Sequence, residues 1–526
     1  MLIRLWRRTA AGTGEKLRPH ACRAALLAAL LTLCGTAAPA SAAPREDTGR
    51  EVDRYLRERM AETETPGMAY AIVDRERIER VGTRGHDGRG KPVTNRTPFL
   101  WGSVAKPVAA TAVMGLVEDG RVALDRSVRS YLPGFTLADR EAAADITVRH
   151  LLTHTSGIPE RTGATDRFDR HEDPYGEAVD DLASVTPAAE PGTRHLYSSA
   201  NYLLLGALVE AVTGRSYADH LKTAVLDPLR MDGTVATPAR AARLPDGHSY
   251  VYGRPVAVPA RFDRTGPSYG YLGGDVEDLA HFAMAHLAEG RLGKSRLLRP
   301  DSVRAMHHGT ARVHDSAAYG LGWRDDDANA DLGTRTVWHG GAAPGYHAAV
   351  VLLPDTGRAL VVLQNIYGYF QDSALAATSL GAARILAGGT PEDAGEDPAY
   401  KPLLAVGTTV AVAVAAATGW TLFRLLRPAG TSASRRRVAL TTAVWVLLGA
   451  GLAHGAWFAV PDLLGAGPDL VRLYAPDLGW LLVAVAVGGS ALAVVRLVQG
   501  LTLLRRARDG APSSPARSVP ADTEGV

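Results

Sequence analysis

A serine followed three positions later by a lysine is the pair best suited to nucleophilic chemistry in this sequence. Ser103 and Lys106 precede Pro107 and an apolar helix pattern over residues 108–117. Proline is tolerated only in the first turn of a helix, so we expect a helix to begin at about Ser103. Residues three apart share a helix face, and a lysine amine that burial keeps partly neutral can take the serine's proton. A helix cap beside a surface lysine is the alternative.

A tyrosine just ahead of a second predicted helix is another candidate. Tyr197 is followed by the small polar residues Ser198, Ser199 and Asn201. A tyrosine hydroxyl in such surroundings can pass a proton to a leaving group. A half-buried structural tyrosine is the alternative.

The third candidate is a predicted strand that ends in two glycines, within the run His339, Gly340, Gly341 and Ala342. Glycine allows close approach to a backbone, so N–H groups there could donate hydrogen bonds to a substrate carbonyl oxygen. A plain glycine bulge is the alternative.

The three motifs together resemble the serine β-lactamase and penicillin-binding-protein superfamily. The similarity is to the branch of class C β-lactamases, D-alanyl-D-alanine carboxypeptidases and related esterases. It extends over about residues 51–387. Three further stretches carry it: EDGRVALD at 118–125, LLTHTSGIP at 151–159 and YGLGW at 319–323.

The resemblance implies a role for each residue of the motifs. Ser103 would attack an amide or ester carbonyl and form an acyl-enzyme, and Lys106 would accept the serine proton. Tyr197 would pass a proton to the leaving group and later activate water. The backbone N–H groups of Ser103 and Ala342 would hold the oxyanion. The substrate-binding and oxyanion set would be Ser199, Asn201, His339, Gly341 and Ala342.

Two departures from the family pattern bear on the substrate. The position two residues after the tyrosine is usually asparagine and here is Ser199. The strand motif usually has threonine after its lysine or histidine, and here Gly340 follows His339. Histidine is mostly neutral near pH 7, and Gly340 offers no hydroxyl to a substrate carboxylate. We therefore expect esters or other amides to fit at least as well as penicillins or a free D-alanine terminus.

Strand and helix patterns alternate around these motifs. Short runs of strand-forming residues predict strands over 67–73, 78–82, 335–338, 346–353 and 358–363, with turn residues between the last two. Helical periodicity predicts helices over 51–60, 107–118, 201–212 and 276–287. We expect an α+β fold, in which one antiparallel sheet from both chain ends is flanked by helices and carries a helical subdomain. The resemblance implies the β-lactamase/transpeptidase-like version of that fold.

The first 42 residues are typical of a signal peptide. Arginines precede an apolar run over 24–33, and small residues follow at 40–42. An uncleaved anchor is the alternative. Cys22 and Cys34 are the only cysteines, so no disulfide scaffold, zinc–thiolate cluster or cysteine nucleophile is expected downstream.

Three apolar blocks, over 403–423, 438–460 and 479–498, each approach the ~20 residues that span a bilayer. Arginines crowd the first connection and follow the last block, whereas the second connection is acidic. The positive-inside rule places the C-terminus in the cytoplasm and the chain before residue 403 outside. The predicted order is a signal peptide (1–42), a hydrolase domain (43–389), a linker (390–402), three membrane helices (403–504) and a cytoplasmic tail (505–526).

The composition narrows the function classes. The 526 residues carry a net charge of +3, from 58 basic and 55 acidic side chains, which gives no reason to expect a nucleic-acid partner. No H-E-x-x-H spacing is present, and we expect neither a metal nor a cofactor. The leading hypothesis is a multi-pass cell-membrane serine hydrolase with an extracytoplasmic catalytic domain. Its substrate would be a small-molecule or peptide amide or ester, with a cell-wall fragment as one candidate. The alternative is a catalytically silent sensor of cell-wall fragments on the same fold.

Overall fold

The computed structural model describes residues 45–168, 172–392, 395, 397–427, 434–464 and 466–509. The predicted signal peptide and both cysteines lie outside the described residues, as do most of the predicted tail and part of the predicted linker.

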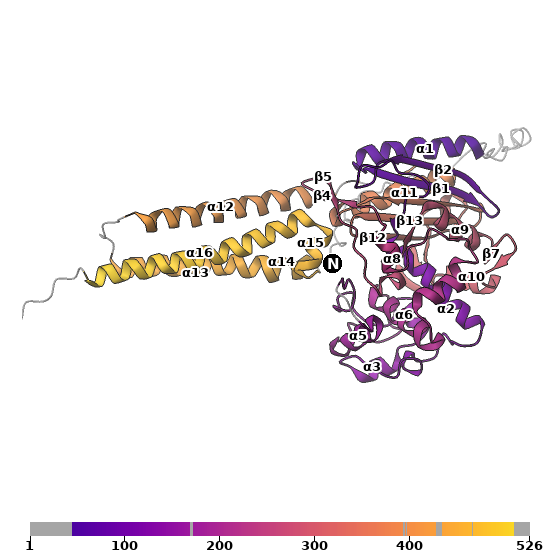
Figure 1. The fold of residues 1–526 in the computed structure, drawn as a ribbon, viewed down its shortest axis with the longest axis horizontal. Helices are drawn as coiled ribbons and strands as arrows, with labels where there is room; N and C mark the ends of the chain where they lie inside the picture. Colours follow the sequence, from indigo (N-terminus) through magenta and orange to yellow (C-terminus); the bar gives the residue numbers. More distant parts are fainter. Residues whose placement is uncertain are drawn as a thin grey trace, which may run out of the picture. The chain divides into compact units, whose positions relative to one another are not determined.

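An eight-stranded antiparallel sheet is the centre of the part of the chain before the long apolar helices (Figure 1), with strand order β2-β1-β14-β13-β12-β11-β10-β9. Its strands are β1 (Gly67–Asp74), β2 (Ile78–Gly85), β9 (Ala311–His314), β10 (Ala317–Tyr319), β11 (Arg324–Asp326), β12 (Thr336–Ala343), β13 (Tyr346–Leu353) and β14 (Arg358–Gln364). β1 lies between its hairpin partner β2 and β14, so the predicted sheet from both chain ends is confirmed.

The central strands are buried on both faces, because helices cover each side. Every residue of β13 and β14 is buried. Alternate residues of β1 point to opposite faces: Ala69 packs in the large core, whereas Met68 packs in the smaller one. Helices α1 (Arg45–Glu62) and α11 (Asp372–Leu386) supply the smaller core, and α9 (Val276–Leu287) packs against β1 and β14 from the large-core side.

A helical subdomain carries two of the three sequence motifs and confirms the predicted α+β class. Its helices are α2 (Ala105–Glu118), α3 (Arg140–Asp145), α4 (Val148–Leu152), α5 (Pro174–Asp181), α6 (Ser199–Thr213), α7 (Tyr217–Leu221) and α8 (Pro238–Ala241). The remaining short helix, α10 (Pro300–His307), precedes β9.

Short strands form small sheets outside the eight-stranded one. β3 (Phe99–Leu100) pairs with β6 (Gly273–Gly274), directly before the serine motif. The others are β4 (Gly247–Val251), β5 (Arg254–Val258), β7 (Arg291–Leu292), β8 (Ser295–Arg296) and β15 (Ile366–Tyr367).

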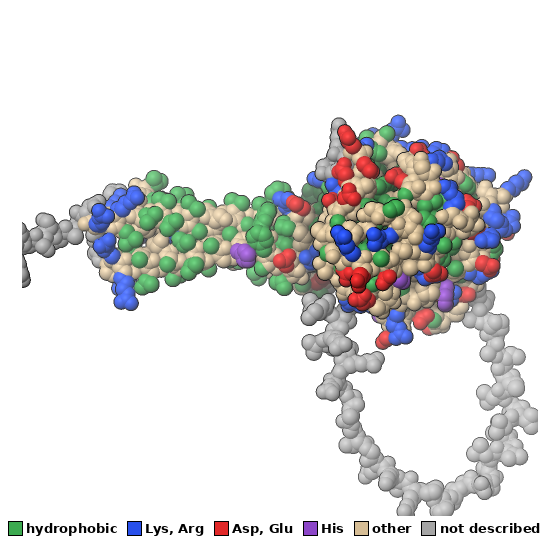
Figure 2. All heavy atoms as spheres, turned by 90° about the horizontal axis from the view of Figure 1, so that it is seen from below, with side chains coloured by type: hydrophobic (Ala, Val, Ile, Leu, Met, Phe, Trp, Pro, Cys, Tyr) green, Lys and Arg blue, Asp and Glu red, His purple; other side chains and the backbone are tan. Residues whose placement is uncertain are grey.

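Three helices after residue 400 are long and apolar enough to cross a bilayer: Tyr400–Leu426, Arg435–Leu464 and Pro476–Arg506. The first is α12 (Tyr400–Leu426). The second runs from α13 (Arg435–His454) through one π-helical turn into α14 (Val460–Leu464), and the third is α16 (Pro476–Asp509). Figure 2 shows hydrophobic side chains along their surface and arginines gathered at one end. A short helix, α15 (Pro468–Tyr474), lies in the second connection. Each helix extends past its predicted apolar block, and α16 continues to Asp509.

Candidate active site

Ser103 lies in a tight turn between β3 and α2. The prediction that the α-helix begins at Ser103 is wrong by two residues, because Gly102–Val104 form a 3-10 turn and α2 begins at Ala105. Gly102 has a positive φ of 54°, and a Cβ there would lie 2.5 Å from the carbonyl carbon of Gly341. Only glycine suits both the conformation and the space. The turn therefore holds the serine against β12.

Lys106 is fully buried beneath that turn. Its Nζ donates hydrogen bonds to Ser103 Oγ at 3.0 Å, to the Tyr269 carbonyl oxygen at 2.8 Å and to Ser199 Oγ at 3.4 Å. The Tyr269 carbonyl fixes the amine next to the serine. The alternative interpretation of a solvent-facing surface lysine does not match this burial.

The Tyr197 ring lies beside the lysine amine. Its centroid is 4.8 Å from Lys106 Nζ and 4.3 Å from the ring centroid of His154. His154 Nδ1 accepts a hydrogen bond from the Ser198 backbone N–H at 3.1 Å, which fixes the chain next to Tyr197. Burial lowers the pKa of His154 well below its usual value, so this ring is neutral. Within the described part of the chain the Tyr197 hydroxyl forms no hydrogen bond, which leaves it available to a bound molecule.

Asn201 and Ser199 lie in different environments. Asn201 is fully buried; its Nδ2 lies 3.1 Å from His154 Nδ1, and its Oδ1 accepts a bond from Ser156 Oγ at 2.6 Å. It therefore supports the Tyr197 segment from the interior. Ser199 instead lines a cavity, where its N–H and Oγ donate to the Glu160 carboxylate at 3.0 and 3.2 Å.

Glu160 was missed by the sequence reasoning. Burial raises the pKa of its carboxyl group, although the charge of Lys106 opposes that shift. The residue directly follows Pro159, the end of the LLTHTSGIP stretch, so its place beside a family motif was the available signal.

His339 is buried and neutral. Its Nδ1 lies 2.6 Å from the Gly340 carbonyl oxygen, which can only accept, so Nδ1 carries the proton. Nε2 is then free to accept from the Tyr319 hydroxyl at 2.9 Å. Burial, followed by the charges of Arg324 and Lys106, lowers the pKa of His339 well below its usual value. His339 therefore supplies no positive charge for a substrate anion.

β12 continues past the two glycines, contrary to the predicted strand end. Its pairing with β13 runs on through Gly341 and Ala342 to Ala343. A Cβ at Gly341 would overlap the Trp101 carbonyl and lie 2.6 Å from the Ser103 nitrogen. The glycine thus permits a close backbone approach in mid-strand. A Cβ on Gly102 would likewise overlap the Ala342 nitrogen. The backbone N–H groups of Ser103 and Ala342 therefore lie at the same contact between the Gly102 turn and β12.

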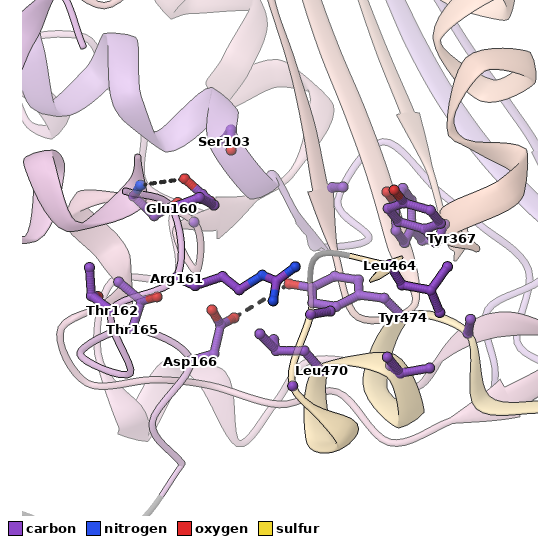
Figure 3. A pocket seen from close by; sticks show the side chains of 18 of the residues that line it. Ser103, Glu160, Arg161, Thr162, Thr165, Asp166, Tyr367, Leu464, Leu470 and Tyr474 are labelled. Carbon is purple, nitrogen blue, oxygen red and sulfur yellow. Dashed lines mark hydrogen bonds between the residues drawn. The ribbon is translucent and has the colours of Figure 1, made fainter. Parts of the chain in front are cut away.

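A cavity of about 640 Å³ opens beside Ser103 (Figure 3), a size typical of small-molecule sites. Of the predicted residues, Ser103, Ser199 and Ala342 line it, whereas Lys106, Tyr197, Asn201, His339 and Gly341 are not among its lining residues. Among the described residues no group of three His, Cys, Asp or Glu side chains could hold a metal ion.

An antiparallel sheet flanked by helices, with a serine at a helix start and a buried lysine one turn on, defines a serine-hydrolase class of protein. The sequence model of the family described as Beta-lactamase matches residues 52–384. The chain therefore belongs to the beta-lactamase family, a family of serine hydrolases.

Individual relatives agree with this membership. "Penicillin-binding protein 4" of Amycolatopsis lactamdurans is 33% identical over 314 residues, 58% of this chain and 82% of that protein. The D-stereospecific amidohydrolase from Streptomyces sp. has a TM-score of 0.51 and 25% identity, over 60% of this chain and 94% of that one. The octameric penicillin-binding protein homologue from Pyrococcus abyssi shares the fold, with a TM-score of 0.55 and 24% identity over 66% of this chain and 78% of that one.

Proposed function

We propose that this protein is a membrane-anchored serine hydrolase that cleaves an amide or ester bond through an acyl-enzyme on Ser103. The single observation that carries the proposal is the 3.0 Å contact between Lys106 Nζ and Ser103 Oγ at the wall of a ligand-sized cavity. A buried amine within hydrogen-bonding distance of a serine hydroxyl is the arrangement that activates this weak nucleophile.

Each step of the reaction then has a group to perform it. Lys106 Nζ takes the proton as Ser103 Oγ bonds to the carbonyl carbon. The backbone N–H groups of Ser103 and Ala342 hold the oxyanion. The leaving group departs with a proton delivered through Tyr197, whose ring lies beside the lysine amine. Water then attacks the carbonyl carbon of the acyl-enzyme, and its proton passes through Tyr197 and Lys106 to Ser103 Oγ. This step releases the acid and the free serine.

The substrate preference follows from the departure in the strand motif at His339 and Gly340. A neutral His339 and a glycine at 340 supply neither a cation nor a hydroxyl for a substrate carboxylate. We expect esters and uncharged amides to be cleaved better than penicillins or peptides with a free D-alanine terminus. The names of the relatives above, which include a penicillin-binding protein and an amidohydrolase, support hydrolysis of amide bonds.

The test uses the full chain in lipid nanodiscs with three substrates: p-nitrophenyl acetate, a chromogenic cephalosporin and a D-alanyl-D-alanine peptide. We expect the ester to turn over fastest and Ser103→Ala to abolish its turnover. No turnover of any of the three, with no covalent labelling by a fluorophosphonate, would instead support the silent sensor.

Within this proposal the catalytic domain faces the outside of the cell. Arg427 and Arg435 flank the first connection between the long helices, and Arg506 lies in the last turn of α16. Asp462 lies at the end of the second span, and Asp469 lies in the second connection. Positively charged connections stay in the cytoplasm. A C-terminal green fluorescent protein is expected to fluoresce, and a C-terminal alkaline phosphatase is expected to be inactive. The opposite pair of results would reverse the orientation.

A further inference from the structure

One wall of the cavity beside Ser103 is built by the second connection between the long apolar helices and not by the catalytic region of the proposed function, residues 45–392. The residues of this connection and of the two helix ends beside it that line the cavity include Leu464, Leu470, Val471, Tyr474 and Leu478. We call them the aliphatic wall. No step of the proposed reaction uses them.

Specific contacts fix the aliphatic wall next to the serine. The Tyr474 ring meets the Tyr367 ring edge to face at 5.7 Å between centroids, and its hydroxyl donates to Asp166 Oδ1 at 3.4 Å. Arg161 Nη2 donates to the Asp462 carbonyl oxygen at 3.3 Å. These contacts join both sides of the cavity.

A second group of contacts lies at the start of the third apolar helix. Asp477 Oδ2 accepts hydrogen bonds from the Tyr252 backbone N–H at 2.9 Å and from the Tyr400 hydroxyl at 2.6 Å. Phe370, another cavity residue, packs with Tyr400, Leu404 and Val471. The wall is therefore tied to the catalytic region at several points.

The two sides of the cavity differ in polarity. Figure 3 shows Ser103 and Glu160 on one side and Leu464, Leu470 and Tyr474 on the other. The polar side presents the groups that would hold a carbonyl. The opposite side presents branched aliphatic chains and a tyrosine ring, which gain from contact with hydrocarbon.

The aliphatic wall is also continuous with the ends of two candidate membrane spans. Leu464 is the last residue of the span Arg435–Leu464, and Leu478 lies in the first turn of the span Pro476–Arg506. Span ends lie at the boundary between headgroups and hydrocarbon, where the ester and amide bonds of membrane amphiphiles are found.

We propose that the substrate is a membrane-resident ester or amide with an aliphatic chain, and that this chain packs on the aliphatic wall while its carbonyl reaches Ser103. This inference rests on the proposed function and names the substrate class for the same site. A hydrocarbon chain in this cavity replaces water against apolar side chains. Loss of the contact between the chain and the aliphatic wall therefore lowers kcat/KM by about tenfold or more.

The test compares p-nitrophenyl octanoate with p-nitrophenyl acetate on the full chain in nanodiscs. Leu470→Gln is expected to lower the octanoate-to-acetate ratio of kcat/KM by about tenfold, because an amide replaces part of the aliphatic wall. Leu470→Met, which stays apolar, is expected to retain the wild-type ratio. Leu463→Gln is the matched control, because Leu463 is 86% exposed and is not among the residues lining the cavity.

The outcomes separate this inference from the proposed function. Ester turnover that survives Ser103→Ala overturns the proposed function itself. If turnover requires Ser103 but the octanoate-to-acetate ratio of kcat/KM is the same in the wild type and in Leu470→Gln, only the role of the aliphatic wall is overturned. An equal rise of both rates in Leu470→Gln also overturns it, because the wall would then merely obstruct the site. A fluorescent diacyl ester embedded in the nanodisc distinguishes a substrate that comes from the membrane from one that comes from solution. Cleavage of this ester supports the membrane source, whereas cleavage of the soluble octanoate alone contradicts it.

Discussion

The side-chain nitrogen of Lys106 lies 3.0 Å from the hydroxyl oxygen of Ser103, at the base of a cavity that the serine lines. The lysine has no exposed surface, and its second strong hydrogen bond, at 2.8 Å, goes to the carbonyl oxygen of Tyr269. This arrangement restricts the amine to one position. Both the proposed chemistry and the following predictions depend on it.

Removal of the amine is expected to stop the acylation step. Lys106→Met keeps the length of the side chain but has no group to accept the serine proton, so kcat/KM for p-nitrophenyl acetate should fall by about 10²–10⁴-fold. Steady-state kinetics on the full chain measure this loss. Lys222→Met is the control, because Lys222 pairs with Asp227 on the surface, and its rate should stay at the wild-type value. A Lys106→Met variant with wild-type kcat/KM would remove the lysine from the mechanism.

A side chain at Gly341 is expected to disturb the oxyanion donors. In Gly341→Ala the new methyl group would lie 2.6 Å from the backbone nitrogen of Ser103, so the nucleophile turn must move. Loss of one oxyanion donor lowers kcat by about 10²–10³-fold. Gly340→Ala is the control on the adjacent residue, where the nearest atom to a Cβ belongs to the Trp338 ring, at 3.2 Å. Equal kcat values in the two variants would contradict the close-approach role of Gly341.

A hydroxyl at position 340 is expected to change substrate preference. Gly340→Thr restores the group that the family pattern places there, with a small shift of Trp338 to admit the Cβ. The ratio of cephalosporin acylation to ester hydrolysis should rise by about tenfold, since a hydrogen bond to a charged group contributes about 1.5–3 kcal/mol. Gly340→Ala, which adds the bulk without the hydroxyl, should leave the ratio unchanged. A ratio that is the same in all three proteins would show that the missing hydroxyl does not explain the preference.

Acid is expected to destabilise the catalytic region through buried histidines. His307 is buried, its Nε2 lies 3.1 Å from His286 Nδ1, and burial lowers the pKa of His307 from 6.5 to about 3. The unfolded chain binds this proton below about pH 6.5, whereas the folded chain excludes it down to about pH 3. The contribution of His307 to the free energy of unfolding is thus at its full value above about pH 6.5. As the pH falls toward 3, the free energy of unfolding decreases by about 1.4 kcal/mol per pH unit from this group.

Thermal unfolding of the full chain between pH 7.5 and 4.5 checks this expectation. His307→Gln keeps a hydrogen-bonding side chain but does not titrate, so its melting temperature should depend less steeply on pH. His286, whose pKa burial also lowers, should leave part of the slope in place. Identical pH slopes for the two proteins would rule out His307 as a source.

Local sequence patterns were sufficient to predict a central strand of the sheet and a helix that packs on it. The ranges expected for β13 and α9 match the observed strands and helix residue for residue. Those segments have clear apolar patterns, and turn residues such as Pro354 and Gly357 separate β13 from β14. The start of α2 was placed two residues early, because only the structure reveals the positive φ of Gly102 and the 3-10 turn that follows.

The parts of the site that the sequence did not predict come from contacts between distant segments. The carbonyl of Tyr269 holds Lys106 from 163 residues away, and a backbone carbonyl has no signature in the sequence. The family resemblance implied that Asn201 lies at the substrate, but the buried side chains of His154 and Ser156 hold it inside the fold. The aliphatic wall was predicted only as part of a connection between membrane helices.

The identity of the acylated residue tests the central claim most directly, because Ser103 and Ser199 both line the cavity. The full chain is incubated with a fluorophosphonate and digested, and tandem mass spectrometry locates the adduct. We predict a single adduct on Ser103, which is absent from the Ser103→Ala protein. An adduct on Ser199, or undiminished labelling of Ser103→Ala, would contradict the assignment of Ser103 as the nucleophile.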